Sequence, residues 1–392
     1  MTYNFDELVN RRNSNCVKYD AAYQIYGTND LQQMWIADMD FKTPDFIIKA
    51  IEERAKHPVL GYGFHGDGFY NSIVNWMKTR HNWTIERDWI YFAPGIVAGL
   101  SIIVQAFTQP GDKVLIFTPV YNPFYNVVKN QDRMLITSSL VNEDNTYRID
   151  FDDFENKLKE GVKMVVFCNP HNPVARCWTP EELERVGGLC LQYGVLLVSD
   201  EIHADLIMPG FKHTVLASIS PEIAHNTITC MAPSKSFNMA GLSTSEVIIS
   251  NPELGKRYSE YVMDRLHVEM GNLFGDVALE AAYTQGADWI DQLNAYIFGN
   301  VEFSQQYIAD NLSFIRTYKH EATYLLWMDF TALPLTHEQL WRKMIDEAGL
   351  ALNDGIIYGT EAYKFLRMNL ACPKSCVEES LLKIKEAFSE YL

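Results

Sequence analysis

The stretch VKMVVFCNPHNPVARCWTPEELERVGGLCLQYGVLLVSDEIHAD, residues 162–205, decides the fold class. Continuous apolar runs stand near its two ends, and the segment between them carries helical signals. Thr179, followed by Pro180 and Glu182, is the residue pattern of a helix N-terminus. Fully apolar strands separated by a helix are typical of a parallel sheet that is covered by helices on both faces. The stretch therefore predicts a strand–helix–strand unit of an α/β fold.

The same alternation extends over the middle of the chain. Further apolar runs are WIYFAP (89–94), KVLIFT (113–118), NTITCMA (226–232) and SEVIIS (245–250). After about residue 288 a long helical stretch is followed by two strands that alternate with helices. We therefore expect a large α/β domain at 46–288 and a smaller α+β domain formed by 1–45 and 289–392.

Composition restricts the classes of function. The 392 residues include 33 Lys and Arg against 50 Asp and Glu, which gives a net charge of −17, and no basic tract occurs. Because phosphate backbones and anionic lipids bind to clustered cations, neither nucleic acid nor membrane is an expected partner. No apolar run is long enough to span a bilayer, and the opening MTYNFDELVNRRNSN lacks the apolar core of a secretory signal. The seven cysteines form no CxxC pair, so we expect free thiols and a cytoplasmic protein.

Lys235 is the only lysine of MAPSKSFNMAGLSTS, residues 231–245, and it directly follows an apolar run. No acidic residue lies within ten positions on either side. Two interpretations remain open from these residues alone. Lys235 is either a solvated loop lysine or an amine whose partner is a ligand.

Asp200 ends the apolar run VLLVSD, at the carboxyl end of a predicted strand. Open α/β sheets form their ligand crevice at this edge. A buried carboxylate needs a partner, which is either a neighbouring protein group or a ligand. A metal site of Asp200, His203 and Asp205 is a further interpretation, but this spacing matches no standard ligand set, and we expect no metal.

Four more positions carry polar chemistry at predicted strand ends or inside apolar runs. Gly95 lies at a strand-to-helix turn, where free N–H groups hold anions, and Ser234 can add a hydroxyl donor. Asn172 lies in an Asn-Pro loop after a strand, where it either serves the turn or offers its amide to a ligand. Arg367 lies within an apolar run, so it pairs with a distant acid or with a ligand carboxylate.

GYGFHG, residues 61–66, fits the dinucleotide-binding pattern G-x-G-x-x-G literally. That motif must follow a strand, whereas the preceding residues 47–60 form an amphipathic helix pattern. We interpret the stretch as a glycine-rich loop that exposes Tyr62.

Taken in order, these residues match the needs of pyridoxal 5′-phosphate (PLP). Its aldehyde needs an amine, its pyridine nitrogen a carboxylate, its phosphate N–H and hydroxyl donors, and its ring a stacking face such as Tyr121. An amino-acid substrate needs a cation for its carboxylate. Lys235, Asp200, Gly95, Tyr121 and Arg367 supply these groups, so PLP is the expected cofactor.

Five stretches carry a family resemblance: WIADMDF (35–41), CNPHNPVARCWTPEEL (168–183), VSDEIHADLI (198–207), SKSFNMAGL (234–242) and RMNLACP (367–373). They resemble the MalY/PatB cystathionine β-lyase branch of the fold-type I aminotransferase-like enzymes. The resemblance covers residue 30 to the end and implies the PLP-dependent transferase fold, with a mostly parallel seven-stranded sheet and a smaller α+β domain. It also implies a homodimer.

The resemblance assigns roles residue by residue. It implies that Lys235, Tyr121 and Tyr62 are catalytic, with Lys235 bonded to the cofactor and Tyr62 reaching over from the other subunit. The cofactor-binding residues that it implies are Gly95, Ile96, Val97, Tyr121, Asn172, Asp200, His203, Ser234, Lys235 and Tyr62. Arg367 binds the substrate carboxylate. Ala175 departs from the family's glycine, and it would add strain of roughly 1 kcal/mol if its φ is positive. The sequence assigns no role to Asp38 or Asp40.

The expected reaction is α,β-elimination. L-Cystathionine or a related cysteine S-conjugate would give a thiol, pyruvate and ammonia, after Lys235 takes the Cα proton. Transamination uses the same residues and remains the alternative, and only the resemblance favours elimination. A regulatory protein-binding role is a possible second activity, since the family includes a member that restrains a transcription activator.

Overall fold

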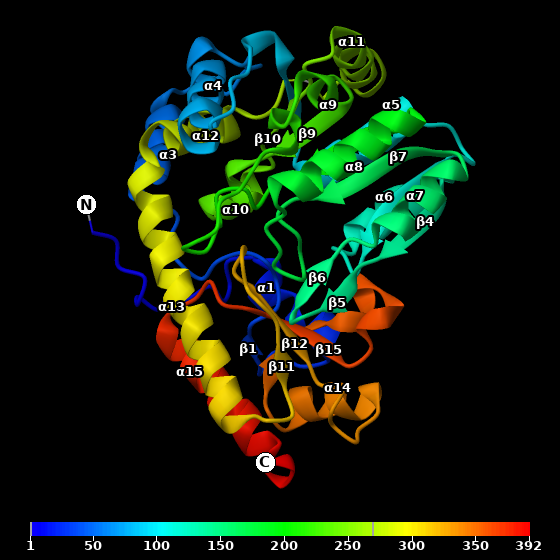
Figure 1. The fold of residues 1–392 in the computed structure, drawn as a ribbon. Coiled ribbons are helices and arrows are strands. Elements are labelled where there is room, and N and C mark those ends of the chain that lie inside the picture. Colours follow the sequence, from blue (N-terminus) through cyan, green and yellow to red (C-terminus); the bar gives the residue numbers. More distant parts are fainter. Residues whose placement is uncertain (1, 269) are drawn as a thin grey trace.

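The computed structural model describes residues 2–268 and 270–392 and has a seven-stranded sheet at its centre (Figure 1). Its strand order is β2-β10-β9-β8-β7-β3-β4. The strands are β2 (Ile90–Ala93), β3 (Lys113–Thr118), β4 (Met134–Ser139), β7 (Val162–Cys168), β8 (Leu196–Asp200), β9 (Thr227–Met231) and β10 (Ser245–Ile248). Only β10 runs against its neighbours β2 and β9, so the predicted α/β fold with a mostly parallel sheet is confirmed.

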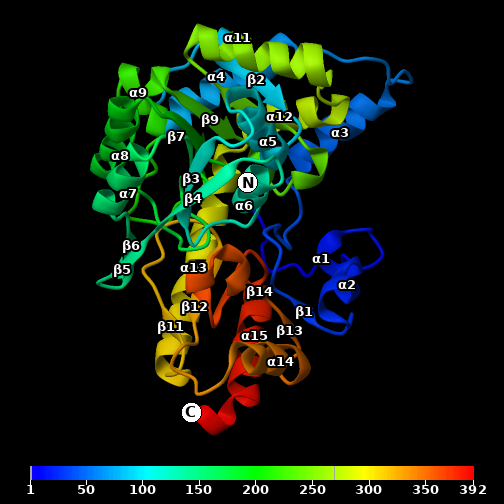
Figure 2. The ribbon, with the colours of Figure 1, turned by 90° about the vertical axis from the view of Figure 1, so that its right-hand side faces the viewer.

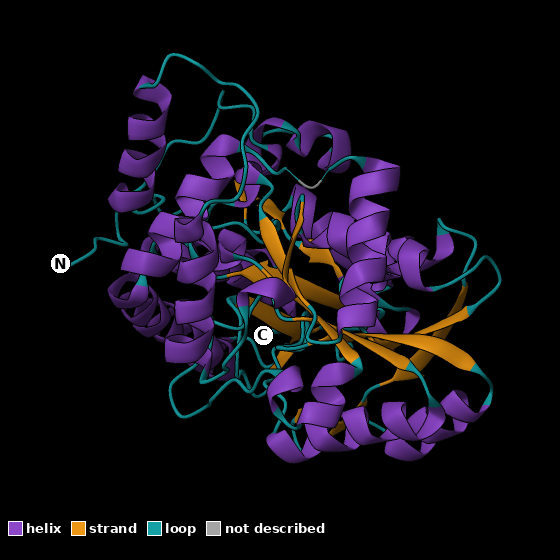
Figure 3. Ribbon diagram, turned by 90° about the horizontal axis from the view of Figure 1, so that it is seen from above, coloured by secondary structure: helices purple, strands orange, loops and turns teal. Residues whose placement is uncertain are grey.

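Helices lie on both faces of this sheet (Figure 3). Alternate residues of β3 point to opposite sides: Val114 and Ile116 pack with α5 (Ile96–Phe107) and α6 (Pro123–Lys129). Leu115 and Phe117 pack with α7 (Phe151–Lys159) and α8 (Pro180–Tyr193). Two buried faces explain why the strands read as continuous apolar runs instead of alternating ones.

Four further long helices belong to this part of the chain: α3 (Asp45–Lys56), α4 (Asp67–His81), α11 (Pro252–Glu260) and α12 (Leu273–Gln285). Two short helices, α9 (Pro221–His225) and α10 (Pro233–Ser236), also belong to it. A hairpin of β5 (Val141–Glu143) and β6 (Thr146–Arg148) follows β4.

A second sheet of four strands has the order β11-β12-β15-β14. These strands are β11 (Arg316–Thr317), β12 (Leu325–Asp329), β14 (Asn353–Asp354) and β15 (Phe365–Asn369), and the helices beside them are α13 (Ala287–Asn311), α14 (His337–Asp346) and α15 (Lys374–Ala387). The N-terminal helices α1 (Val17–Asp20) and α2 (Ala22–Tyr26) lie next to this part (Figure 2). Strand β1 (Gln32–Gln33) pairs with β13 (Leu350–Ala351).

The predicted division of the chain falls at element boundaries. The junction 45/46 lies at the start of α3, and the junction 288/289 lies in the first turn of α13. The domain assignment itself stays a prediction. Within the described ranges, every helix is too short or too polar to traverse a lipid bilayer.

The capping pattern expected at Thr179 is present. Its hydroxyl accepts a hydrogen bond from the backbone N–H of Glu182, and the Glu182 carboxylate accepts one from the N–H of Thr179. This reciprocal cap fixes the start of α8, directly after the loop that carries Asn172.

We predict that Thr179→Ala lowers the free energy of unfolding by about 1 kcal/mol, because one N–H at the helix start loses its acceptor. Denaturant titration monitored by circular dichroism measures the change. Thr179→Ser keeps the hydroxyl and is the control. Equal loss in both variants would contradict the capping role.

Candidate active site

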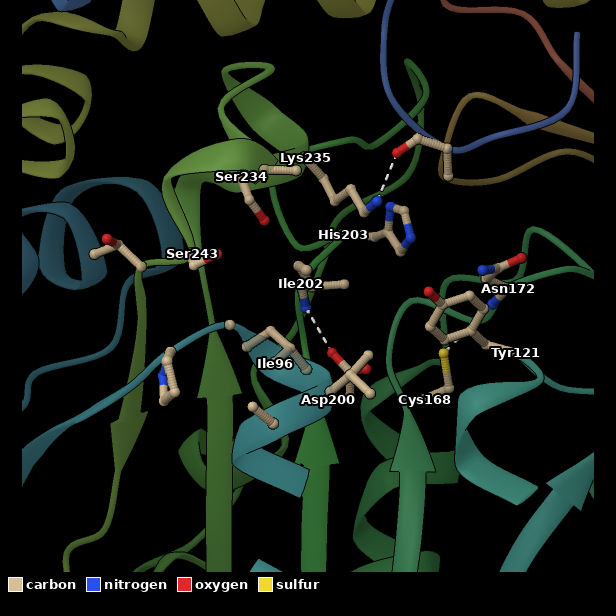
Figure 4. A pocket seen from close by; sticks show the side chains of 17 residues that line it. Ile96, Tyr121, Cys168, Asn172, Asp200, Ile202, His203, Ser234, Lys235 and Ser243 are labelled. Carbon is tan, nitrogen blue, oxygen red and sulfur yellow. Dashed lines mark hydrogen bonds between the residues drawn. The ribbon is translucent and has the colours of Figure 1, made fainter. Parts of the chain in front are cut away.

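A cavity of about 200 Å³ lies beyond the carboxyl ends of the central strands. Nine of the predicted site residues line it: Gly95, Ile96, Val97, Tyr121, Asn172, Asp200, His203, Ser234 and Lys235. They lie at the end of, or in the loops and helix starts after, five different strands: β2, β3, β7, β8 and β9 (Figure 4). Parallel strands bring residues that are distant in sequence to one edge of the sheet, which is the usual position of a ligand crevice.

Lys235 lies on the short helix α10, just after β9, and its side chain enters the cavity. Its Nζ donates a hydrogen bond to the carbonyl of Ala37, at 2.5 Å. Burial lowers the pKa of Lys235 to about 8, although the charges of Asp38 and Asp200 oppose the lowering. The amine is therefore partly neutral near pH 7 to 8 and able to act as a nucleophile or base. The interpretation as a solvated loop lysine is wrong.

Asp200 ends β8 and is 4% exposed. One carboxylate oxygen accepts the backbone N–H of Ile202 at 3.1 Å. Burial raises the pKa of Asp200 to about 7, and the Ile202 N–H and the charge of Lys235 only partly offset this. A cationic N–H placed against this carboxylate would hold it in the charged form.

Asn172 lines the cavity on the side opposite Ser234 (Figure 4). The predicted Arg367 is not one of the lining residues, but it contacts Asn172. Arg367 Nη1 donates to Asn172 Oδ1 at 2.9 Å, and Nη2 donates to Asn353 Oδ1 and to the carbonyl of Trp35. The Asn172 amide oxygen is thereby occupied, which leaves its NH2 group as the donor. Arg367 is buried, its Nε has no partner among the described residues, and none of the ion pairs formed by those residues includes it. The distant-acid interpretation of Arg367 finds no support.

The other end of the cavity offers neutral donors to an anion. Gly95 has φ 92°, a left-handed conformation that favours glycine, and α5 starts directly after it with free N–H groups. Ser234 lies across from this turn, and Ser243 and Thr244 also line the cavity here. Sequence reasoning missed Ser243 and Thr244, although GLSTS carries three adjacent hydroxyl residues that signal such a site.

His203 is buried, and its Nδ1 has no partner among the described residues. Burial and the charge of Lys235 lower its pKa well below the ordinary value, so the ring is neutral. Asp205 does not face the cavity with it. The Asp205 carboxylate binds Ser236 Oγ, Trp76 Nε1 and His81 instead. The three residues of the metal interpretation therefore do not converge.

Tyr62 is 97% exposed, on the loop between α3 and α4, and does not line the cavity of its own chain. The residues before GYGFHG form α3, so the loop follows a helix and not a strand. GYGFHG is therefore not a dinucleotide-binding motif, as the sequence predicted.

Ala175 has φ 56°, so the condition for strain at this position is met. Its carbonyl accepts the N–H groups of Glu321 and Ala322 at 2.9 and 3.1 Å. These bonds tie the Asn172 loop to the segment before β12 and hold the alanine in a conformation that costs about 1 kcal/mol.

Comparison with known proteins identifies the family. The model of aminotransferase class I and II matches residues 30–384. The chain is 39% identical to cystathionine β-lyase PatB of Bacillus subtilis, over 98% of this chain and 100% of that protein. The chain belongs to this family, in the group of PatB.

Solved structures agree with this assignment. A PLP-bound putative aminotransferase from Clostridium difficile 630 superimposes with a TM-score of 0.96, at 43% identity over 98% of this chain and 100% of the other. Cystalysin from Treponema denticola, which contains a PLP cofactor, gives a TM-score of 0.96 at 36% identity over the full length of both chains. The predicted family and fold are confirmed.

The cavity fits PLP by its own chemistry. The amine of Lys235, the carboxylate of Asp200 and the N–H groups after Gly95 face one space. The orphaned Nδ1 of His203 and the free NH2 of Asn172 add polar groups that a ligand can satisfy.

We predict a pH-dependent stability effect of Asp200 in protein from which the cofactor has been removed. Because the folded pKa lies above the unfolded value, the folded state binds the extra proton, and stability falls as pH rises from about 4 to about 7. Asp200→Asn has no charge to bury there. At pH 8 the variant should exceed the parent in free energy of unfolding by on the order of 2 kcal/mol.

Denaturant titrations of both proteins at pH 5 and pH 8 test this prediction. The difference between their free energies of unfolding should be larger at pH 8 than at pH 5. A gap that is constant or narrows would show that the buried carboxylate carries no such cost.

Proposed function

We propose that this protein is a PLP-dependent carbon–sulfur β-lyase. It converts L-cystathionine or a related cysteine S-conjugate, with water, to a thiol (homocysteine from cystathionine), pyruvate and ammonia. The observation that carries the proposal is the partly neutral amine of Lys235 in one cavity with the buried carboxylate of Asp200. The full-length similarity to PatB selects elimination among the reactions that this arrangement serves.

The residues divide the work of holding the cofactor. When bound, PLP supplies a ring that stabilises negative charge at the substrate Cα. Lys235 would bind its aldehyde carbon, and Asp200 would keep its pyridine nitrogen protonated. Asn172 would donate to the ring hydroxyl, and Tyr121 would offer its ring face. The N–H groups of Ile96 and Val97 and the hydroxyl of Ser234 would hold the phosphate beside Gly95, and His203 would pack as a neutral ring.

Lys235 and Arg367 act on the substrate. Arg367 binds its carboxylate, and Arg367's bonds to Asn172 and Asn353 fix the guanidinium for this contact. Lys235 would take the substrate Cα proton, because its lowered pKa leaves part of the amine neutral. The thiolate then leaves from Cβ.

The active unit is a homodimer in this proposal, and the protein works in the cytoplasm. Tyr62 supports the dimer: a tyrosine that is 97% exposed on a loop with the exposed Leu60 and Phe64 is an apolar surface in need of a partner. In a dimer, Tyr62 completes the cavity of the neighbouring subunit.

We predict that the purified protein releases pyruvate and free thiol from L-cystathionine in equal amounts. Its visible cofactor absorbance and this activity should both disappear in Lys235→Ala, because the amine that binds the aldehyde is lost. Thiol and pyruvate assays with absorbance spectra measure these effects. Amino transfer to a keto acid without thiol release would establish the aminotransferase instead.

Subunit complementation tests the role of Tyr62. Lys235→Ala and Tyr62→Ala each inactivate the homodimer, but a mixed dimer has one site with both residues intact. Random mixing after denaturation should restore about a quarter of the parental activity, because half of the dimers are mixed and each has one working site. No recovery, from subunits shown to exchange, would place Tyr62 outside the partner's site.

A further inference from the structure

Asp38 and Asp40 belong to a cluster of four charged side chains beside the cavity. Arg11 forms a fork with Asp38, with Nη1–Oδ1 at 2.9 Å and Nη2–Oδ2 at 2.6 Å. Arg11 Nη1 also reaches Asp40 Oδ1 at 2.8 Å. Lys18, only 1% exposed, pairs with Asp40 Oδ2 at 2.7 Å and lies 3.7 Å from Asp38 Oδ1. The two acids thus have different main partners.

The backbone of the segment 35–41 is held by two asparagine side chains from other parts of the chain. Asn369 of β15 donates to the carbonyls of Ile36 and Asp38, at 2.6 and 2.7 Å. Asn238, three residues after Lys235, binds the N–H and carbonyl of Met39 and the carbonyl of Phe41. Among the described residues Ala37 has no strand partner, so these side-chain bonds, with the backbone bond from Asp40 N–H to the carbonyl of Ala371 at 2.9 Å, hold the segment that carries the Ala37 carbonyl.

That carbonyl is the acceptor of the reactive amine. Ala37 O accepts Lys235 Nζ at 2.5 Å and Tyr324 Oη at 3.0 Å. Asp38 is the next residue, and its side chain is fixed by Arg11. The geometry therefore places a carboxylate next to the point where the Lys235 amine is held.

Several charged or titratable groups face Lys235 from the elements packed around it. Asp38 lies on the segment 35–41, Asp200 and His203 follow β8, and Arg367 lies on β15. Tyr324 and Tyr121 are neutral, since burial raises their pKa values. Among the charges, Asp38 acts on Lys235 more strongly than Arg367 or Asp200 does, and it raises the pKa of the amine against the lowering by burial.

We propose that Asp38 is a positioning residue for Lys235: it holds the Ala37 carbonyl against the amine and favours the protonated form of the lysine nitrogen, while Arg11 limits this effect by neutralising Asp38. Asp40 instead neutralises the charge of the buried Lys18. The inference rests on the proposed function, because it concerns the nitrogen that binds the cofactor.

The test compares two variants that break the same ion pair from opposite sides. Asp38→Asn removes a negative charge near Lys235, and Arg11→Gln removes a positive charge while leaving Asp38 in place. If the pair acts only by holding the fold, both variants should change the enzyme in the same direction. If Asp38 acts on the Lys235 nitrogen, their effects should be opposite in sign.

The visible absorbance of the cofactor in the holoenzyme, titrated with pH, reports the protonation of the Lys235 nitrogen. We expect the midpoint to move down by roughly half a pH unit to one unit in Asp38→Asn and to move up in Arg11→Gln. In the profile of kcat against pH, the acid limb should likewise move down in Asp38→Asn and up in Arg11→Gln. Asp38→Glu should restore the midpoint, because it keeps the charge.

Asp40→Asn is the matched control, since it leaves the fork between Arg11 and Asp38 in place. The midpoint of its absorbance titration should move by less than half of the shift that Asp38→Asn causes. Unchanged midpoints in both ion-pair variants, shifts of the same sign, or an equal shift in Asp40→Asn would overturn the proposal. If the parental protein shows no visible absorbance band when it is supplied with PLP, the proposed function itself is overturned. The two failures are therefore distinguishable.

Discussion

The partial withdrawal of the Lys235 amine from water is the constraint on which the rest of the site depends. An ammonium group in a water-poor cavity is costly, so its pKa falls toward the working range of pH. Burial shifts the pKa of Asp200 in the opposite direction, upward, because the charged form of Asp200 is the anion. One cavity thus holds an amine that readily loses its proton and a carboxylate that needs a nearby cation to stay charged. In the proposed complex the protonated pyridine nitrogen of PLP would be that cation.

The cavity lies at the carboxyl edge of the seven-stranded sheet, and a contact with the four-stranded sheet is made beside it. Asn172 follows a strand of the seven-stranded sheet, and Arg367 lies in the four-stranded sheet, yet the two side chains are hydrogen-bonded. The segment 35–41 closes the same space and is fixed by Asn369 from one sheet and Asn238 from the other part of the chain. The hydrogen bond between Arg367 and Asn172 links the proposed contact of the substrate carboxylate to the proposed donor to the cofactor ring.

Buried polar groups of the site are satisfied mainly by side-chain amides and backbone carbonyls. Ion pairs are concentrated in the neighbouring cluster of Arg11, Lys18, Asp38 and Asp40. This separation keeps most charges at a distance from the reacting atoms and leaves Asp38 as the charge that adjusts Lys235 most. Low local polarity makes each remaining charge more effective.

Sequence alone determined the elements and their order. Continuous apolar runs are a direct consequence of strands covered on both faces, and the cap at Thr179 is a local pattern, so both could be predicted from neighbouring residues. The position of Asp200 at a strand end followed for the same reason. The choice of elimination over transamination came from family motifs, since the residue types themselves serve both reactions.

Only the tertiary structure decided what depends on contacts between distant residues. The acceptor of Lys235 is a backbone carbonyl 198 residues away, and backbone groups leave no signature in a sequence. Arg367 meets Asn172 across 195 residues, and Asp38 and Asp40 find Arg11 and Lys18 through a fold that no local pattern encodes. Burial, which sets the pKa values of Lys235 and Asp200, is likewise a property of the assembled chain, because the residues that line the cavity come from segments far apart in the sequence.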